Sequence, residues 1–498
     1  QKIRWVLEMM RGPELAGARI TRVERSRRDD GVEVFTFHDA APGDPELDLE
    51  TTRDEMLALG EAGATIAVHQ LRAPVREVVA VVPDIPAFGW RTFATVDGAL
   101  PTPKLRQRRA PTVFQRRNFV SGGAVLGEGR VLENEHLRVE VDPADGTLTL
   151  ESDGMRITGA NRYVDGGDGG DTYNYSPPTV DRVIDRPDTV TVDVLEPGPV
   201  RARLLVTATY RWPSHAIGDE HACRARSDDT VETAMRTTLE LRAGERFVRV
   251  RVDLDHRVRD HRLRAHFPLA TPVTASHAEC AFAVVERGLT AEGGPHEVGL
   301  PTFVSRRFVD AGGVALLHDG LLEYEVVDGG TELALTLLRA TGYLSRSEPS
   351  LRPNPAGPLD PLEGPQLQRR LTLDYAVYPH RGDWHDGAVA DAADDFLVPL
   401  ERVSSGGLLG ASRPSIGTAL SLDGARLSAL TRDADGAIVA RLVNLSSADA
   451  TARVAFPDPP SGTGRASGQV VNLLGEPRRP FADEVALGPW EIVTLRFD

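Results

Sequence analysis

Arg246-Phe-Val-Arg-Val-Arg-Val-Asp-Leu-Asp255 is the segment that decides the fold class. From Val248 onward, apolar and charged residues alternate, which places the apolar side chains on one face of an extended strand. One buried face and one wet face are typical of antiparallel sheets. Similar runs, separated by Gly, Pro and Asp turn signals, occur at residues 190–195, 202–210, 232–241, 333–338, 371–378 and 437–444, and in the closing segment 489–497.

Helical periodicity is confined to two short segments, near Leu49–Leu59 and Ala388–Phe396. The sequence therefore predicts an all-β protein with few short helices. A chain of 498 residues is too long for one core and should form two to four domains. We expect a small β-rich domain over residues 1–115, a large β domain over 116–382 and a β-sandwich over 383–498. Linkers are predicted at Pro101–Arg117 and Pro379–Asp386.

Composition excludes several classes of function. A net charge of −16 argues against nucleic acid or an anionic membrane as a partner, because either needs a basic face. No apolar run approaches the ~18 residues of a membrane span. Two cysteines, Cys223 and Cys280, are too few for a disulfide framework or a cysteine-built metal site, and whether they pair stays open. Because the first residue is Gln1 rather than methionine and no signal-peptide pattern follows, we expect the native N-terminus to be missing.

The stretch Asp165-Gly-Gly-Asp-Gly-Gly-Asp-Thr-Tyr-Asn-Tyr-Ser-Pro-Pro178, the glycine loop, is the strongest candidate for a functional site. Its three carboxylates repel one another unless a cation, arginines or hydroxyl donors lie between them. The glycines permit positive φ angles, so we expect the acids to converge on one point. Tyr173, Asn174 and Tyr175 follow at once and suit a polyhydroxylated ligand. A solvated acidic turn is the alternative.

Other interpretations of the polar motifs stay open. Residues 166–174 fit one copy of the calcium β-roll nonapeptide, although such rolls need several stacked copies. The His256–Arg264 segment is rich in arginine, and its guanidinium groups could neutralise the glycine loop or bind sugar hydroxyls. Surface ion pairs would explain that segment equally well. Four tryptophans could stack on a sugar ring or pack in a core, namely Trp90, Trp212, Trp384 and Trp490.

Motifs for other chemistry are missing from the sequence. There is no G-x-S-x-G nucleophile elbow, Walker loop, dinucleotide fingerprint or H-E-x-x-H helix. A carboxylate pair for glycoside hydrolysis cannot be identified by spacing alone.

At the glycine loop the chain resembles the C-terminal half of bacterial glycoside hydrolase family 38, the α-mannosidase and mannosylglycerate hydrolase group. That family carries D-G-D-E-Y-N/D-Y-S-P here, and this chain departs from it at Thr172. Further similar segments follow in order over about residues 80–498: Phe88–Phe93, Leu132–Val141, Asp145–Leu150, Arg259–Arg264, Gly320–Val326, Leu335–Gly342 and Arg352–Gln366.

The resemblance implies a mutarotase-like β-supersandwich flanked by smaller β domains. It also implies that the nucleophile, the acid/base residue and a zinc ion held by His and Asp belong to an α/β barrel. No H-x-H-x-D zinc motif occurs in this sequence, so no catalytic residue and no metal ligand are assigned to it. The isolated chain is expected to be inactive. Its expected role is to form the wall of a mannoside-binding cleft through Asp168, Asp171, Tyr173, Asn174, Tyr175 and Arg262.

The implied partners are a mannoside substrate and the catalytic barrel, in a bacterial cytoplasmic protein that could form homo-oligomers. Two alternative functions compete with this prediction. One is a stand-alone carbohydrate-binding module. The other is a mutarotase-like epimerase with His261 or His266 as an acid–base residue, for which fold similarity alone would be weak support.

Overall fold

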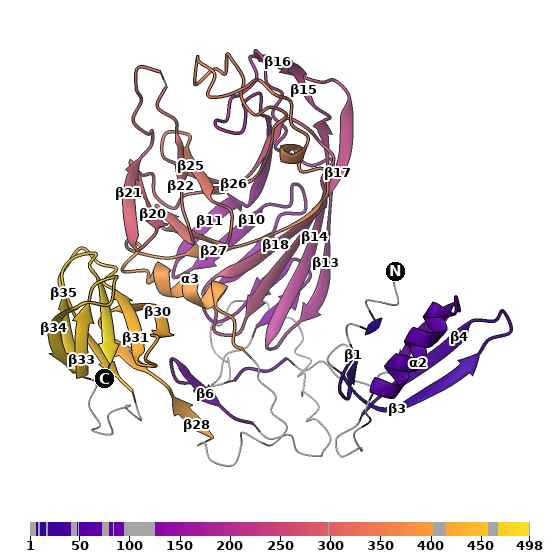
Figure 1. Cartoon of the computed structure of the whole chain (residues 1–498). Helices are drawn as coiled ribbons and strands as arrows, with labels where there is room; N and C mark the ends of the chain where they lie inside the picture. Colours follow the sequence, from indigo (N-terminus) through magenta and orange to yellow (C-terminus); the bar gives the residue numbers. More distant parts are fainter. Residues whose placement is uncertain are drawn as a thin grey trace. The chain divides into compact units, whose positions relative to one another are not determined.

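The structure is a computed structural model that describes residues 6–7, 10–15, 18–40, 47, 49–71, 79–82, 84–93, 125–296, 298–401, 415–456 and 467–497. The predicted Pro101–Arg117 linker lies outside these residues. The chain divides into two compact units, Gln1–Ala80 and Val81–Asp498, and each is described by itself (Figure 1).

Among its described residues, the first unit contains a five-stranded sheet and a helix of 12 residues. Its strands follow the order β1 (Met10–Arg11), β2 (Glu14–Leu15), β3 (Ala18–Arg27), β4 (Glu33–Asp39), β5 (Ile66–Leu71). β4 and β5 run parallel and are connected through α2 (Glu50–Glu61), which confirms the predicted helix near Leu49–Leu59. Met56 of α2 joins Phe35 and Phe37 of β4 in a common apolar core.

The second unit is dominated by three sheets that share one hydrophobic core. The largest has nine antiparallel strands in the order β13 (Thr189–Pro197), β14 (Arg201–Pro213), β17 (Thr230–Arg242), β18 (Val248–Asp255), β27 (Arg370–Pro379), β24 (Val314–His318), β23 (Phe308–Ala311), β20 (Ala275–Cys280), β21 (Ala283–Gly288). β18 contains the alternating segment quoted first, and its Val248, Val250, Val252 and Leu254 are buried in that core.

The other two sheets have five strands each. One follows the order β12 (Arg162–Gly167), β19 (His261–Pro268), β26 (Glu332–Ala340), β25 (Glu323–Val327), β22 (Thr302–Val304), and the other β11 (Met155–Ala160), β10 (Leu148–Ser152), β9 (Arg138–Val141), β8 (Val131–Glu133), β7 (Leu126–Glu128). A two-stranded ribbon, β15 (Ala216–Gly218) with β16 (Cys223–Arg226), and the short 3-10 helix η1 (Gly364–Gln366) lie in the connections. All the alternating segments quoted from the sequence form strands, which confirms the all-β prediction.

The C-terminal part has its own eight-stranded sheet and a separate core. The order is β29 (Ser421–Asp423), β32 (Ala450–Ala455), β35 (Glu484–Leu487), β34 (Pro477–Ala482), β33 (Ser467–Val471), β36 (Ile492–Phe497), β31 (Ile438–Val443), β30 (Arg426–Arg432). β6 (Gly89–Arg91) pairs with β28 (Ile416–Thr418). The second predicted helix is confirmed as α3 (Val389–Leu397).

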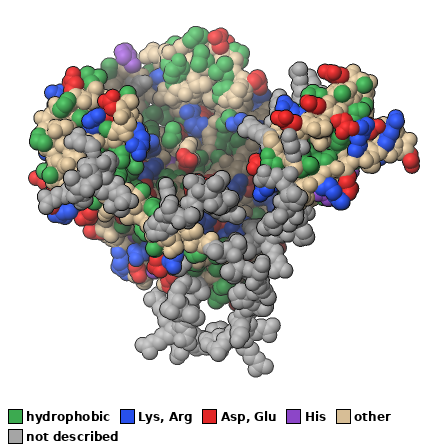
Figure 2. Space-filling view, turned by 60° about the horizontal axis from the view of Figure 1, so that its bottom comes forward, with side chains coloured by type: hydrophobic (Ala, Val, Ile, Leu, Met, Phe, Trp, Pro, Cys, Tyr) green, Lys and Arg blue, Asp and Glu red, His purple; other side chains and the backbone are tan. Residues whose placement is uncertain are grey.

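Charged side chains connect α3 to both neighbouring β regions. Arg307 donates to Glu279 at 2.6 Å and also bonds Asp394 of α3. Arg426 of β30 donates to the second oxygen of Asp394 at 2.6 Å. In the described part of the chain, no helix combines the length and apolarity that a membrane span requires. On the face seen in Figure 2, basic and acidic side chains are interspersed rather than gathered into one basic patch.

Candidate functional site

The glycine loop leaves β12 at Gly167, opposite His261 of β19. Asp165, Asp168 and Asp171 are all buried, each with 0% exposure. They do not meet at one point, so that expectation is wrong. Each carboxylate instead has an arginine of its own, and this arrangement removes the repulsion between like charges without a shared cation.

Asp168 is held from two directions. Arg339 of β26 donates from Nε to Oδ2 at 2.7 Å, and the Gly170 N–H donates to Oδ1 at 2.9 Å. Burial raises the pKa of the Asp168 carboxyl, and Arg339 opposes that shift. The pKa of Arg339 is also raised by Asp168, although burial opposes this. Because a buried guanidinium needs a counter-charge, the ionised pair is the stable form at neutral pH.

Asp171 has still more donors. The backbone N–H groups of Tyr173 and Asn174 each donate to Oδ1 at 3.0 Å, and that of Arg346 donates to Oδ2 at 2.8 Å. Arg352 also forms an ion pair with this carboxylate. Burial acts to raise the pKa of Asp171, but Arg352 and the N–H donors outweigh it and the pKa is lowered. Both oxygens of Asp171 are therefore used inside the protein.

Three of the four loop glycines, Gly167, Gly169 and Gly170, are needed for space. None of the four glycines lies at positive φ, so the expectation that they supply positive φ angles is wrong. A Cβ on Gly169 would lie 2.0 Å from the Cβ of Cys223, and one on Gly170 would lie 2.0 Å from the Asn174 carbonyl oxygen. The chain therefore folds back on itself more closely than any side chain permits.

Asp165 belongs to a different, buried network. It lies 2.5 Å from His261 Nδ1 and 2.7 Å from Arg226 Nη2. His261 Nε2 lies 2.7 Å from Nε2 of His256, whose Nδ1 donates to the Leu367 carbonyl at 2.9 Å. Burial and the neighbouring His261 lower the pKa of His256 to about 4, so this ring is neutral at pH 7.

Both histidines proposed for an epimerase are engaged inside the protein. His261 has 0% exposure and both ring nitrogens lie at hydrogen-bond distance from a partner. His266 is also buried, and its Nδ1 lies 2.9 Å from Glu332. Burial lowers the pKa of His266. This geometry offers no support for acid–base chemistry on a sugar at either ring.

Arg262 is a buried support residue. It donates to Glu325 at 2.8 Å and pairs with Glu323 at 2.6 Å, while its guanidinium lies 4.5 Å from the Tyr175 ring centroid. The direct ion pairs with the loop carboxylates come from Arg226, Arg339 and Arg352. Of the 256–264 arginines, Arg262 helps to neutralise the loop through its charge, which acts to lower the pKa of Asp168 against burial. Arg339 and Arg352 lie in segments that the family resemblance had already marked, but their spacing from the loop gave no sign of the contact.

Three of the predicted binding residues reach the surface. Tyr173 is 53% exposed, while Asn174 and Tyr175 are half-buried. Arg352 donates from Nη1 to the Asn174 side-chain oxygen at 2.7 Å, which leaves the amide N–H groups as possible donors to a ligand. Burial raises the pKa of Tyr175 to about 12, so its hydroxyl is protonated. Contact of this surface group, called the loop rim below, with a sugar stays a prediction.

Three of the four candidate tryptophans pack against hydrophobic cores. Trp212 is buried, and Trp384 and Trp490 stack on each other at 6.4 Å. Cys223 and Cys280 are both free. Among the described residues no group of three or more His, Cys, Asp or Glu could hold a metal ion. The structure also does not support the calcium interpretation, because the loop carboxylates that would bind the ion are paired with arginines.

Comparison with known families gives two matches in chain order. The model described as "Glycosyl hydrolases family 38 C-terminal domain" matches residues 132–355, and the "Glycosyl hydrolases family 38 C-terminal beta sandwich domain" matches residues 424–495. These matches define the chain as the β-rich portion of a glycoside hydrolase. It belongs to glycoside hydrolase family 38 and carries the C-terminal domains of that family, as the sequence motifs had indicated.

Individual relatives agree with this assignment. A protein of Halalkalibacterium halodurans named "Putative mannosylglycerate hydrolase" is 26% identical over 288 residues, which are 54% of this chain and 30% of that protein. An α-mannosidase from Enterococcus faecalis V583 shares the fold, with a TM-score of 0.62 at 21% identity. The match covers 76% of this chain and 43% of that one.

A second Enterococcus faecalis structure, of a family 38 glycosyl hydrolase, also has a TM-score of 0.62 at 21% identity. It covers 77% of this chain and 45% of the other. The chain thus spans less than half the length of each of these relatives.

Proposed function

We propose that this chain is the non-catalytic β portion of an α-mannosidase-type retaining hydrolase and forms one wall of its carbohydrate cleft. The observation that carries the proposal is the ordered match of both family 38 C-terminal models. In a retaining enzyme one carboxylate attacks the anomeric carbon and a second acid protonates the leaving oxygen. We assign both groups to a catalytic α/β barrel outside these residues.

The family resemblance also implies zinc, but the described residues do not fit it. We therefore assign the zinc ligands to the barrel and derive no step of the reaction through the metal. A cytoplasmic location and self-association stay predictions.

The part of this chain would be to position the sugar. Asp168 and Asp171 are neutralised by arginines and hold the loop rigid, so the loop rim needs little ordering when a ligand binds. The Tyr175 hydroxyl has no hydrogen-bond partner among the described residues, and together with the Asn174 amide it offers donors to sugar oxygens. Groups fixed in advance by packing and buried hydrogen bonds bind with a smaller entropic cost.

Kinetics of the intact enzyme test this role. We expect Tyr175→Phe and Asn174→Ala to weaken transition-state binding by about 1–1.5 kcal/mol each, roughly tenfold in kcat/KM, because each removes one hydrogen bond to the sugar. Asn174→Ala also removes the hydrogen bond that Arg352 donates to Asn174. Gln368→Ala is a matched surface control, since Gln368 bonds only the Arg257 carbonyl. Residues 1–498 alone should show no turnover of an aryl α-mannoside.

Two results would contradict the proposal. One is turnover by residues 1–498 alone, and the other is unchanged kcat/KM in both loop-rim variants. Mannoside binding by the isolated chain through Tyr175 and Asn174, with no catalytic barrel encoded beside it, would instead favour the stand-alone carbohydrate-binding module.

A further inference from the structure

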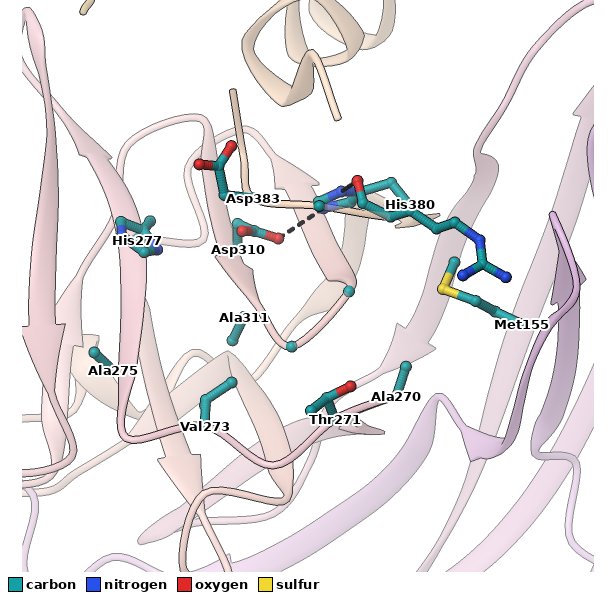
Figure 3. A pocket seen from close by; sticks show the side chains of 14 residues that line it. Met155, Ala270, Thr271, Val273, Ala275, His277, Asp310, Ala311, His380 and Asp383 are labelled. Atoms are coloured by element: carbon teal, nitrogen blue, oxygen red, sulfur yellow. Dashed lines mark hydrogen bonds and ion pairs between the residues drawn. The ribbon is translucent and has the colours of Figure 1, made fainter. Parts of the chain in front are cut away.

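A separate pocket of about 400 Å³ lies on the large β region. Its walls come from the β19–β20 connection, the β23–β24 turn and residues 380–383 after β27 (Figure 3). None of its lining residues belongs to the glycine loop. It is therefore a second candidate site within the same unit.

A buried ion pair forms the polar wall of the pocket. His380 donates from Nε2 to Asp310 Oδ1 at 2.7 Å and from Nδ1 to the Arg381 carbonyl at 3.2 Å. Because both ring nitrogens face acceptors, the ring is an imidazolium. Asp310 is only 4% exposed, yet its Oδ2 has no hydrogen-bond partner among the described residues. This oxygen is not one of the fully buried side-chain atoms, so it can accept a hydrogen bond from a ligand hydroxyl in the pocket.

Asp383 offers a second unused acceptor. Its Oδ1 takes the backbone N–H groups of His385 and Asp386, each at 2.8 Å, while Oδ2 has no partner among the described residues. His277 lies on β20 directly opposite Asp310 in the strand register. Arg381 donates from Nε and Nη2 to the Asp153 carbonyl. The two acids are thus balanced by the His380 imidazolium and the Arg381 guanidinium.

The facing wall is small and mostly apolar. Ala270, Val273 and Ala275 lie across the pocket from Asp310 and His380, and Met155 closes one side (Figure 3). Thr271 adds one hydroxyl to this wall. A ligand in the pocket therefore meets an apolar surface on one side and hydrogen-bonding groups on the other.

We propose that this pocket binds a neutral, polyhydroxylated ring such as a pyranose, with its hydroxyls on Asp310 and Asp383 and its C–H face on the alanine–valine wall. Balanced charges disfavour ions of either sign, since an anion meets two carboxylates and a cation meets His380 and Arg381. Pockets of this size with an apolar lining and a few convergent polar groups are typical of small-molecule sites. The inference stands on the pocket alone and does not require the proposed function.

Ligand-observed saturation-transfer NMR tests the site with methyl α-D-mannopyranoside and methyl α-D-glucopyranoside. The background is Tyr175→Phe/Asn174→Ala, so that loop-rim binding does not contribute. We expect saturable binding that weakens at least tenfold in Asp383→Asn/His277→Ala and in Ala275→Leu, which fills the pocket without changing its charge. His136→Ala, an exposed histidine outside the pocket, should bind as the background protein does.

The outcomes separate this inference from the proposed function. Absence of saturable binding in the Tyr175→Phe/Asn174→Ala background, or equal binding in all pocket variants, would overturn the inference and leave the loop rim untouched. Tighter binding of glucuronate or glucosamine than of the neutral glycosides would overturn the assigned ligand class. Circular dichroism of each variant shows that a loss of binding does not come from unfolding.

Discussion

The carboxylates of the glycine loop and those of the pocket lie in the same β unit. They differ in whether their oxygens all have hydrogen-bond partners within the protein. In the loop, Asp168 and Asp171 are saturated by arginines and backbone N–H groups. In the pocket, Asp310 and Asp383 each use one oxygen for structure and leave the other without a partner among the described residues. A dense acidic motif can therefore be internal scaffolding, while two acids far apart in sequence form the accessible acceptors.

The largest expected effect comes from unpairing a loop carboxylate. Arg352→Met should destabilise the protein by about 3–5 kcal/mol, because Asp171 would stay buried without its partner charge. The free energy of unfolding from urea titration measures this. Arg381→Met in the pocket is the matched comparison and should cost under about 1 kcal/mol, since Arg381 is exposed and donates to one carbonyl. Equal losses in the two variants would refute the contrast between the regions.

Adding one methyl group to the loop should have a smaller but clear effect. In Gly170→Ala the new Cβ meets the Asn174 carbonyl at 2.0 Å, and we expect a loss of about 1–3 kcal/mol from the backbone shift this forces. The control is Gly288→Ala, where no atom lies within 4 Å, in the strand that pairs with Ala275 of the pocket. That change should be neutral or slightly stabilising. Thermal unfolding of both variants decides between tight packing and a tolerant loop.

Sequence patterns predicted the fold far better than the site. Alternation predicted strands because a strand with one buried face demands it, and β14, β17 and β18 have this burial. The predicted 333–338 segment forms β26, which is buried on both faces. The roles of the loop residues depended on Arg339 and Arg352, which reach Asp168 and Asp171 only through sheet pairing and the long connection after β26. The pocket had no local signal at all, because Asp310 and His277 come from separate strands and His380 lies after β27.

The pH dependence of stability should have opposite signs in the two regions. The lowered pKa of Asp171 means that its stabilisation is present above the unfolded value of about 4 and is lost as the pH falls through the folded value. Burial acts to lower the pKa of His380, but Asp310 and the Arg381 carbonyl outweigh it and the pKa is raised. Stabilisation by His380 is therefore complete below about 6.5 and is lost as the pH rises through the folded value.

The difference in unfolding free energy between wild type and His380→Gln, measured from pH 5 to 9, isolates the pocket histidine. This difference should shrink as the pH rises. The total decrease should be about 1.4 kcal/mol for each unit by which folding raises the pKa of His380. The matching variant in the loop is Asp171→Asn. Its difference from wild type in unfolding free energy, measured between pH 5 and 2, should shrink as the pH falls. A difference for His380→Gln that grows with rising pH would mean that the pocket ring is neutral and not paired with Asp310.

The smallest expected effect on stability belongs to Tyr173, although it lies in the middle of the motif. Its ring is 53% exposed and lies 5.7 Å from the Arg352 guanidinium, so Tyr173→Ala should cost no more than about 0.5–1 kcal/mol. If the loop rim contacts substrate, the same variant should lower kcat/KM of the intact enzyme severalfold. The substrate would then lose its contact with the Tyr173 ring, although this ring contributes little to the stability of the protein. Loss of stability without loss of kcat/KM would place Tyr173 with the scaffold of Asp168 and Asp171 and remove it from the sugar-binding surface.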